Sequence, residues 1–161
     1  MDRLWTPWRF EYLRKADQES SCVFCRILVE NNDDANLVLF RSPNLFIILN
    51  LFPYTSGHLL IAVNRHISSL RDAHPEELHE MIEMAAQCED ALRREYHPSG
   101  YNMGFNLGRA AGAGVEHHLH MHVLPRWVGD SNFVSVVGET RVLPEELPAT
   151  YRRLKPYFEK T

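Results

Sequence analysis

The chain has 161 residues, of which 45% are hydrophobic and 24% charged, and this composition and length fit one globular domain. Its formal net charge of −4 provides no global basic field, so we expect no nucleic-acid partner. No apolar run approaches the roughly 18 residues that a membrane span needs, and the first residues lack the pattern of a signal peptide, so we expect no membrane partner.

The first third of the chain predicts an arm, a short helix and three strands. Residues 1–20 are rich in aromatic side chains without a clear period, which indicates an arm packed across the domain or a partner subunit. Cys22 and Cys25 precede a short helical stretch that extends to Glu30. Three β-rich runs bounded by turn-forming residues follow, at 37–41, 45–50 and 58–63.

The middle of the chain predicts one long helix. Pro75 followed by Glu76 and Glu77 is a helix-start signal, because proline fits the first turn and acidic side chains favour the positive end of the helix dipole. Apolar residues then recur at spacings of three and four, which predicts an amphipathic helix over residues 75–96. Cys88 lies on that apolar stripe, so we expect a buried small side chain rather than a reactive thiol.

The last part of the chain predicts two further strands at residues 101–107 and 117–124, separated by a glycine-rich loop. The remaining expected elements are a short strand at 133–137 and, in a C-terminal extension at 138–161, a broken helix at 144–160 that begins at Glu145-Glu146. Together these elements predict a single α+β domain over residues 1–161, with an antiparallel β-meander of about five strands, one long inserted helix, a short N-terminal helix and a C-terminal helix.

Histidine and aliphatic residues alternate strictly along the fifth predicted strand. Because successive side chains of a strand point to opposite faces, His118, His120 and His122 should share one face, while the aliphatic residues between them face the core. Three imidazoles on one face are costly to desolvate unless they hold a metal, a proton network or an anion. Polar strand faces usually carry mixed side chains, so this pattern favours a functional site over a chance alternation.

This His-x-His-x-His pattern, followed by two aliphatic residues, resembles the signature of the histidine-triad superfamily of nucleotidyl hydrolases and transferases. The resemblance extends over nearly the whole chain, since the segments 22–27, 57–58 and 65–67 also occur in the family's order. The segments 4–9 and 125–133 most resemble the bacterial diadenosine tetraphosphate phosphorylase branch. The resemblance implies the family's fold and a nucleotide substrate.

In that family the middle histidine of the triad is the nucleophile, which is His120 in this chain. A neutral imidazole nitrogen can attack the α-phosphorus and form a nucleotidyl-histidine, which splits one difficult displacement into two easier ones. The other ring nitrogen should donate to a backbone carbonyl and so fix the tautomer. His118 is the first member of the triad, and His122 is placed to contact either the α-phosphate oxygens or the departing oxygen.

The resemblance also implies a loop whose backbone N–H groups cradle the phosphate in the transition state. The residues of this loop are Gly112, Ala113, Gly114 and Val115. Many family members carry Gly-Gln-Ser in this stretch, whereas this chain has no glutamine there. The glutamine is expected to help order the leaving group or the incoming water, so its absence puts simple hydrolysis in doubt and leaves room for another acceptor.

The resemblance implies further nucleotide contacts, and each residue concerned also has a purely structural interpretation. Asn106 stands where the family has an amide that binds the α-phosphate, although turn formation is its other reading. Asn50 occupies the position of the family's ribose-binding residue or caps a turn, and His58 is expected to brace the triad from the neighbouring strand. The candidates for an adenine slot, equally compatible with the core, are Leu45, Phe46 and Ile47. The arginines that either reach the polyphosphate or remain solvated are Arg109 and Arg126.

Cys22 and Cys25 form a C-x-x-C motif. No βαβ pattern accompanies the motif, so a thioredoxin-like role is disfavoured, and a zinc site or two free thiols remain. Zinc-bearing members of the superfamily complete a Cys₂His₂ site with a histidine after the third strand and the first triad histidine, here His66 and His118. Three cysteines without a secretion signal indicate a reducing cytoplasm. We expect a structural zinc ion and no organic cofactor.

The expected function is transfer of AMP from a dinucleoside polyphosphate through His120, with inorganic phosphate as the acceptor, so that diadenosine tetraphosphate gives ADP and ATP. The alternatives within the class are hydrolysis of such dinucleotides or of AMP phosphoramidates. From other classes come a zinc-stabilised nucleotide-binding module without turnover and a metallo-oxygenase of the double-stranded β-helix type, which needs more strands. Family members commonly pair, so we expect a homodimer and leave a tetramer open.

Overall fold

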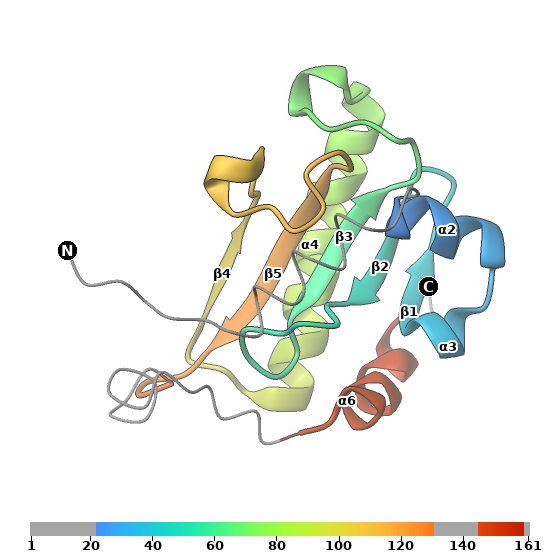
Figure 1. The fold of residues 1–161 in the computed structure, drawn as a ribbon. Coiled ribbons are helices and arrows are strands. Elements are labelled where there is room, and N and C mark those ends of the chain that lie inside the picture. The colour runs from blue at the N-terminus through green and yellow to red at the C-terminus, as the bar shows by residue number, and fades with distance from the viewer. Residues whose placement is uncertain (1–21, 131–144, 160–161) are drawn as a thin grey trace.

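The structure is a computed structural model that describes residues 22–130 and 145–159 (Figure 1). Its centre is one five-stranded antiparallel sheet. The strands are β1 (Val38–Arg41), β2 (Leu45–Leu49), β3 (Leu59–Val63), β4 (Gly100–Gly104) and β5 (His120–Arg126). The α+β prediction is confirmed, and the double-stranded β-helix alternative is wrong because the described strands form a single sheet. The predicted arm at 1–20 and the strand at 133–137 lie outside the described residues.

The order of the strands is β1-β2-β3-β5-β4, so the expectation of a plain meander is wrong. The chain leaves β3, crosses to the far edge at β4 and returns to lie between β3 and β4 (Figure 1). The side chains explain this order. Four of the seven β5 residues are buried, whereas none of the five β4 residues is, and β4 begins and ends with glycine. A strand of this kind is suited to an edge and not to the centre of a sheet.

Two strand boundaries differ from the prediction by three residues, and the others by two or fewer. The fourth strand ends at Gly104 instead of residue 107, and the fifth begins at His120 instead of residue 117. The cause is the register, because Gly104 is already opposite His122 and the chain beyond it has no further partner on β5. The chain between these ends forms a loop with one short 3₁₀ helix, η2 (Arg109–Ala111).

One face of the sheet is covered by α4 (Pro75–Tyr96), which matches the predicted helix (Figure 1). Its start is fixed by a capping box, in which the His74 N–H donates to the Glu77 carboxylate at 2.7 Å. Its apolar stripe, with Met81 and Leu92, packs against alternate residues of β2, β3 and β5. Cys88 is fully buried in this layer, and burial raises the pKa of its thiol, as expected for a structural cysteine.

The other face of the sheet carries α2 (Val23–Glu30), whose Phe24 and Ile27 pack against Phe46 and Leu60 in a second apolar cluster. The short helix α3 (Asp33–Asn36), which was not predicted, follows it and is capped by the Asn32 side chain. None of the described helices combines the length and apolarity needed to cross a membrane.

The C-terminal segment forms α6 (Leu147–Leu154) and the 3₁₀ turn η3 (Lys155–Tyr157), and it closes the β1 edge of the sheet (Figure 1). The Tyr151 hydroxyl donates to the Val38 carbonyl at 3.2 Å, and the Lys155 ammonium donates to the carbonyls of Val38 and Leu39 at 3.3 and 3.1 Å. This edge therefore has main-chain acceptors that are already satisfied by side chains, which protects it from pairing with other strands.

Replacing Gly57 by alanine is expected to lower the free energy of unfolding by about 2 kcal/mol. Gly57 has φ +76°, and an added Cβ would lie 2.9 Å from Leu92 Cδ2 and 3.3 Å from Pro125 Cγ. Urea unfolding measures the change. Gly100→Ala is the matched control, because its added Cβ meets nothing within 4 Å. Equal effects of the two substitutions would contradict the close approach at Gly57.

Candidate active site and metal-ligand cluster

The three triad histidines lie on the face of the sheet that carries α2. His120 and His122 are on β5, opposite Ala62 and Leu60 of β3, and these two β3 residues belong to the α2-side cluster. His118 lies two residues before β5 begins, and it is 1% exposed. The aliphatic residues between them are buried in the α4-side core, as the alternation predicted: Leu119, Met121 and Val123.

His120 is held in one tautomer. Its Nδ1 atom is 2.7 Å from the main-chain oxygen of His118, and a carbonyl can only accept, so Nδ1 carries the proton. The neutral ring therefore keeps its lone pair on Nε2. The Phe24 ring restrains the imidazole from α2, at 5.2 Å between ring centroids. The expected hydrogen bond from the middle histidine to a backbone carbonyl is present.

His58 and His122 form a second ordered pair. The Tyr54 N–H is 3.1 Å from His58 Nδ1, so that nitrogen accepts and His58 carries its proton on Nε2. His58 Nε2 is 2.9 Å from His122 Nδ1 and donates to it. His122 must then carry its own proton on Nε2. His58, the residue before the start of β3, thus supports the last histidine of the triad, as predicted.

The Nε2 atom of His122 is buried and has no hydrogen-bond partner among the described residues. A buried donor without an acceptor costs about 1–3 kcal/mol. Such a group beside the His120 ring, whose centroid is 5.0 Å away, is suited to receive an oxygen of a bound ligand.

Burial keeps the triad neutral. It lowers the pKa of His118 to about 4 and that of His122 to about 4, with smaller contributions from neighbouring imidazoles. Burial also lowers the pKa of His120, although the hydrogen bond to the His118 carbonyl opposes that effect. Neutral imidazole is the form that can donate a lone pair to phosphorus or to a metal.

Cys22, Cys25, His66 and His118 bring four ligand atoms within 4.8 Å of one another. The Sγ–Nδ1 distances are 3.3 Å from Cys22 to His118, 3.3 Å from Cys25 to His66 and 3.7 Å from Cys25 to His118. Zinc bonds of about 2.3 Å to sulfur and about 2.0–2.1 Å to nitrogen give a tetrahedral edge of about 3.6 Å, so the donor set and its spacing fit zinc.

His118 joins this cluster to the triad. Its Nε2–H donates to the Val63 carbonyl at 2.6 Å, which leaves the Nδ1 lone pair directed at the thiols. The main-chain oxygen of the same residue accepts a hydrogen bond from His120 Nδ1–H. One residue therefore contributes a potential metal ligand and the group that orients the middle histidine.

The segment that carries His66 is fixed by an ion pair between a partly exposed arginine and a buried carboxylate. The Arg65 guanidinium donates twice to the Glu77 carboxylate, each time at 2.7 Å, and once to the Asp72 carbonyl at 2.8 Å. Glu77 is 3% exposed, and the Arg65 guanidinium beside it holds the pKa of its carboxyl at about 2. The pair ties the loop after β3 to the first turn of α4.

Replacing Glu77 by glutamine is expected to lower the free energy of unfolding at neutral pH by about 2–3 kcal/mol. The pKa of this carboxyl is about 2 in the folded protein and about 4.3 in an unfolded chain. The stabilisation is therefore complete above about pH 4.3 and is lost as the pH falls towards about 2. Urea unfolding of both proteins between these limits should show the difference shrinking. Glu76→Gln, at an exposed neighbour, is the control, and a gap that does not depend on pH would contradict the assignment.

The glycine-rich loop returns to the face of the triad, because Val115 packs against the α2-side cluster. The N–H of Gly112 is used within the loop, where it donates to the Arg109 carbonyl at 3.0 Å, so this residue does not fit the predicted cradle. Among the described residues, none accepts a hydrogen bond from the N–H groups of Ala113, Gly114 or Val115. Three successive main-chain donors therefore remain for an anion.

The two predicted asparagines differ in their contacts with the histidines. Asn50 caps the turn after β2, since its Oδ1 accepts from the Phe52 N–H at 3.0 Å, and its Nδ2 is 3.3 Å from His58 Nδ1. Asn106 is half-buried two residues beyond Gly104, which is opposite His122. The structure thus places the Asn50 amide against His58 in a capping role, whereas Asn106 is placed only by its position shortly after β4.

Other sequence candidates are placed elsewhere. Leu45 and Ile47 are wrong as adenine contacts, because both are 0% exposed in the core beneath α4. Phe46 is on the triad's face but is also completely buried. Arg126 is held by the Asp130 carboxylate at 2.6 and 2.8 Å and by Asn102, so a polyphosphate contact is not supported. Arg109 is exposed on the loop.

The predictions missed two aromatic residues. Phe24 contacts His118 and His120 from α2, and Tyr54 contacts His58 and His122 from the turn before β3. The C-x-F-C spacing contained a signal for Phe24, because a residue between two ligands must lie near their site. Tyr54 has no comparable signal. The exposed His117 lies in a turn beside Glu116, before β5 begins.

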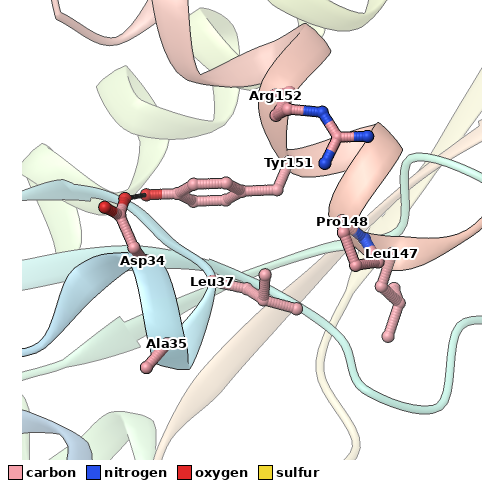
Figure 2. A pocket seen from close by; sticks show the side chains of 7 residues that line it. All are labelled: Asp34, Ala35, Leu37, Leu147, Pro148, Tyr151 and Arg152. Carbon is pink, nitrogen blue, oxygen red and sulfur yellow. Dashed lines mark hydrogen bonds between the residues drawn. The ribbon is translucent and has the colours of Figure 1, made fainter.

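A depression of about 600 Å³ lies away from the histidines, between α3 and α6 (Figure 2). Figure 2 shows Tyr151 reaching across it to Asp34, to which its hydroxyl donates at 2.9 Å. The Tyr151 hydroxyl and the Asp34 carboxylate are therefore bound to each other, Arg152 also lines the depression, and no histidine or cysteine among the described residues does.

Known proteins with a histidine triad are similar to this chain in sequence and in structure. The HIT domain family matches residues 31–128. An AP-4-A phosphorylase of Mycobacterium tuberculosis is 37% identical over 161 aligned residues, which cover 96% of this chain and 83% of that protein. Protein hit of Bacillus subtilis is 28% identical over 116 residues, which cover 72% and 78%. A solved structure of a Zn-bound histidine triad family protein from Mycobacterium smegmatis superposes with a TM-score of 0.69 at 31% identity, covering 85% of this chain and 92% of that one.

Proposed function

The chain belongs to the HIT domain family and is a HIT-type nucleotide-processing enzyme, and from this premise we propose that it transfers AMP from a dinucleoside polyphosphate through a covalent bond to His120. The observation that carries the proposal is the hydrogen bond from His120 Nδ1–H to the His118 carbonyl. It leaves the Nε2 lone pair for phosphorus, and the same carbonyl stabilises the positive charge that develops on the ring.

The proposed substrate is diadenosine tetraphosphate. In the first step His120 Nε2 forms a bond to the α-phosphorus, the bond to the bridging oxygen breaks and ATP departs. In the second step an oxygen of inorganic phosphate attacks the same phosphorus, the phosphorus–nitrogen bond breaks and ADP is released. The two steps restore the neutral imidazole, and no external oxidant or reductant is needed.

Two groups of donors suit the charge that develops on the phosphate oxygens. The buried Nε2–H of His122 donates to an oxygen of the α-phosphate or to the departing oxygen. The N–H groups of Ala113, Gly114 and Val115 act as the anion cradle, with Asn106 as a further amide. Asn50 binds the ribose, from a position that its contact with His58 already fixes.

A structural zinc ion is the second part of the proposal. Cys22, Cys25, His66 and His118 would hold it, and the chemical fit of these donors supports zinc. With four protein ligands the site is closed, so the ion supplies stability and orientation and binds no reacting water. The similar histidine triad family protein from Mycobacterium smegmatis is described as Zn-bound, which supports a zinc ion in this chain.

Phosphate as the acceptor is supported by the mycobacterial relative, which is named AP-4-A phosphorylase, and by the absence of a glutamine from the loop after Gly112. The test is to supply diadenosine tetraphosphate with and without inorganic phosphate and to separate the products. Phosphate-dependent formation of ADP and ATP is expected. AMP and ATP without a phosphate requirement would favour hydrolysis, and nucleotide binding without products would favour a module that does not turn over.

The setting of the enzyme is also proposed from the structure. Cys22, Cys25 and Cys88 form no disulfide in the structure, which supports a reducing cytoplasm. Among the described residues no strand pairs with the outer edge of β4. This available edge supports a homodimer in which the β4 strands of two copies pair. Size-exclusion chromatography with light scattering tests this state, and a monomer at micromolar concentration would contradict it.

A further inference from the structure

Tyr54 lies in the turn between β2 and β3 and contacts both members of the His58–His122 pair. Its ring centroid is 4.7 Å from that of His58 and 6.1 Å from that of His122, and the rings of Tyr54 and His122 are nearly parallel, at 12°. Its main-chain N–H is 3.1 Å from His58 Nδ1. One residue therefore contacts the pair through its backbone and through its side chain.

The main-chain N–H sets the direction of the hydrogen bonds. A peptide N–H can only donate, whereas each imidazole can carry its proton on either nitrogen. If His58 were protonated on Nδ1, two N–H groups would face each other at 3.1 Å, and this arrangement is unfavourable. The sequence of donation therefore starts at Tyr54, passes through His58 and ends at His122.

This direction decides what His122 presents to a ligand. With the observed order, the buried Nε2 atom of His122 carries a proton. With the reverse order, the same atom would present a lone pair to the negatively charged phosphate and repel it. The Tyr54 ring also packs against the His58 ring, at 4.7 Å between centroids, and lies nearly parallel to the His122 ring, so it limits the space into which the two imidazoles can turn.

We propose that Tyr54 is a positioning residue that fixes the direction of donation from His58 to His122 and holds the His122 ring so that its Nε2–H faces the substrate phosphate. This inference rests on the proposed function. It predicts that the contribution of Tyr54 appears in turnover and much less in the affinity for the nucleotide, since Tyr54 acts through the two histidines.

The first test uses the protein as purified, without substrate. Long-range ¹H–¹⁵N spectra of the imidazoles distinguish the two neutral tautomers. Both His58 and His122 are expected as the Nε2–H form. An Nδ1–H form, or a mixture, at either residue would overturn the proposal. The expected spectra from a protein without turnover would overturn the proposed function and still support the positioning role.

The second test separates the backbone from the ring. Tyr54→Ala keeps the N–H, so the tautomers should remain, while kcat falls about tenfold and KM for diadenosine tetraphosphate changes less than about threefold. Tyr54→Pro also removes the N–H, so mixed tautomers and a fall in kcat of about 100-fold are expected. Tyr54→Phe should restore turnover, because it retains both features.

Phe52→Ala is the matched control, since it trims another exposed aromatic residue of the same turn. It should leave the tautomers and kcat unchanged. A rise in KM alone for Tyr54→Ala would overturn the proposal, because it would make Tyr54 a substrate-binding residue. Unchanged kcat for both Tyr54→Ala and Tyr54→Pro would overturn it as well. If Tyr54→Pro does not fold, the spectra of the unaltered protein and the kinetics of Tyr54→Ala decide.

Discussion

Replacement of His120 by alanine is expected to lower kcat for diadenosine tetraphosphate by about 10⁴-fold or more. The substitution removes the only imidazole among the three triad members whose Nδ1 is bound to a main-chain carbonyl and whose Nε2 is left with a lone pair. Steady-state kinetics measures the loss. Rapid quenching of the unaltered enzyme with labelled substrate should also trap an adduct that is labile in acid and stable in base, as expected for a phosphorus–nitrogen bond.

The control for this prediction is His117→Ala. His117 is three residues away in sequence and is exposed beside Glu116, outside the site. It should retain the kcat of the unaltered protein. A His120→Ala variant with full activity, or trapping of AMP on that variant, would exclude the covalent mechanism through this residue.

Replacement of Cys22 by serine is expected to remove most of the bound zinc and to lower the melting temperature by about 10 °C, the equivalent of about 3 kcal/mol. Cys22 is the N-cap residue of α2, so loss of the metal would release this helix, which carries Phe24. It would also release the side chain of His118. Metal analysis by mass spectrometry and thermal unfolding measure the two effects. Treatment of the unaltered protein with a chelator should give the same shift.

Cys88→Ala separates zinc binding from general stability. This thiol is on the buried face of α4, in the core between the helix and the sheet, so its truncation should lower stability by about 1–2 kcal/mol and leave the zinc content unchanged. Because the His118 carbonyl binds His120, loss of zinc should also reduce turnover. Full zinc content in Cys22→Ser would contradict the ligand assignment, whatever its effect on stability.

The sequence predicted the elements whose pattern has one interpretation. The long helix from Pro75 to Tyr96 was predicted with its ends, because its start signal and apolar spacing agree. The alternation before and within β5 predicted which residues face the core. Proximity of Cys22, Cys25, His66 and His118 also agrees with the ligand set that the family resemblance implied.

Errors arose where several interpretations fit the same residues. β2 is buried on both faces, so its sequence could not show that Leu45 and Ile47 face α4 while Phe46 faces the histidines. The two terminal glycines of β4 are compatible with an edge position, but its place beside β5 depends on the crossover through α4, which no local pattern encodes. Tyr54 contacts His58 through its main-chain N–H within the turn, but its ring faces His122 only after β3 and β5 have paired.

The two edges of the sheet differ, and this difference limits how copies of the chain can associate. At β1 the Tyr151 hydroxyl and the Lys155 ammonium occupy main-chain oxygens, and a shift in register between Val38 and Phe40 distorts the strand. A sheet with one available border can join another only once. Growth into a fibril by successive addition of strands is therefore blocked after a single junction. Removal of the last turn of α6 would uncover the β1 edge and allow further strands to add there.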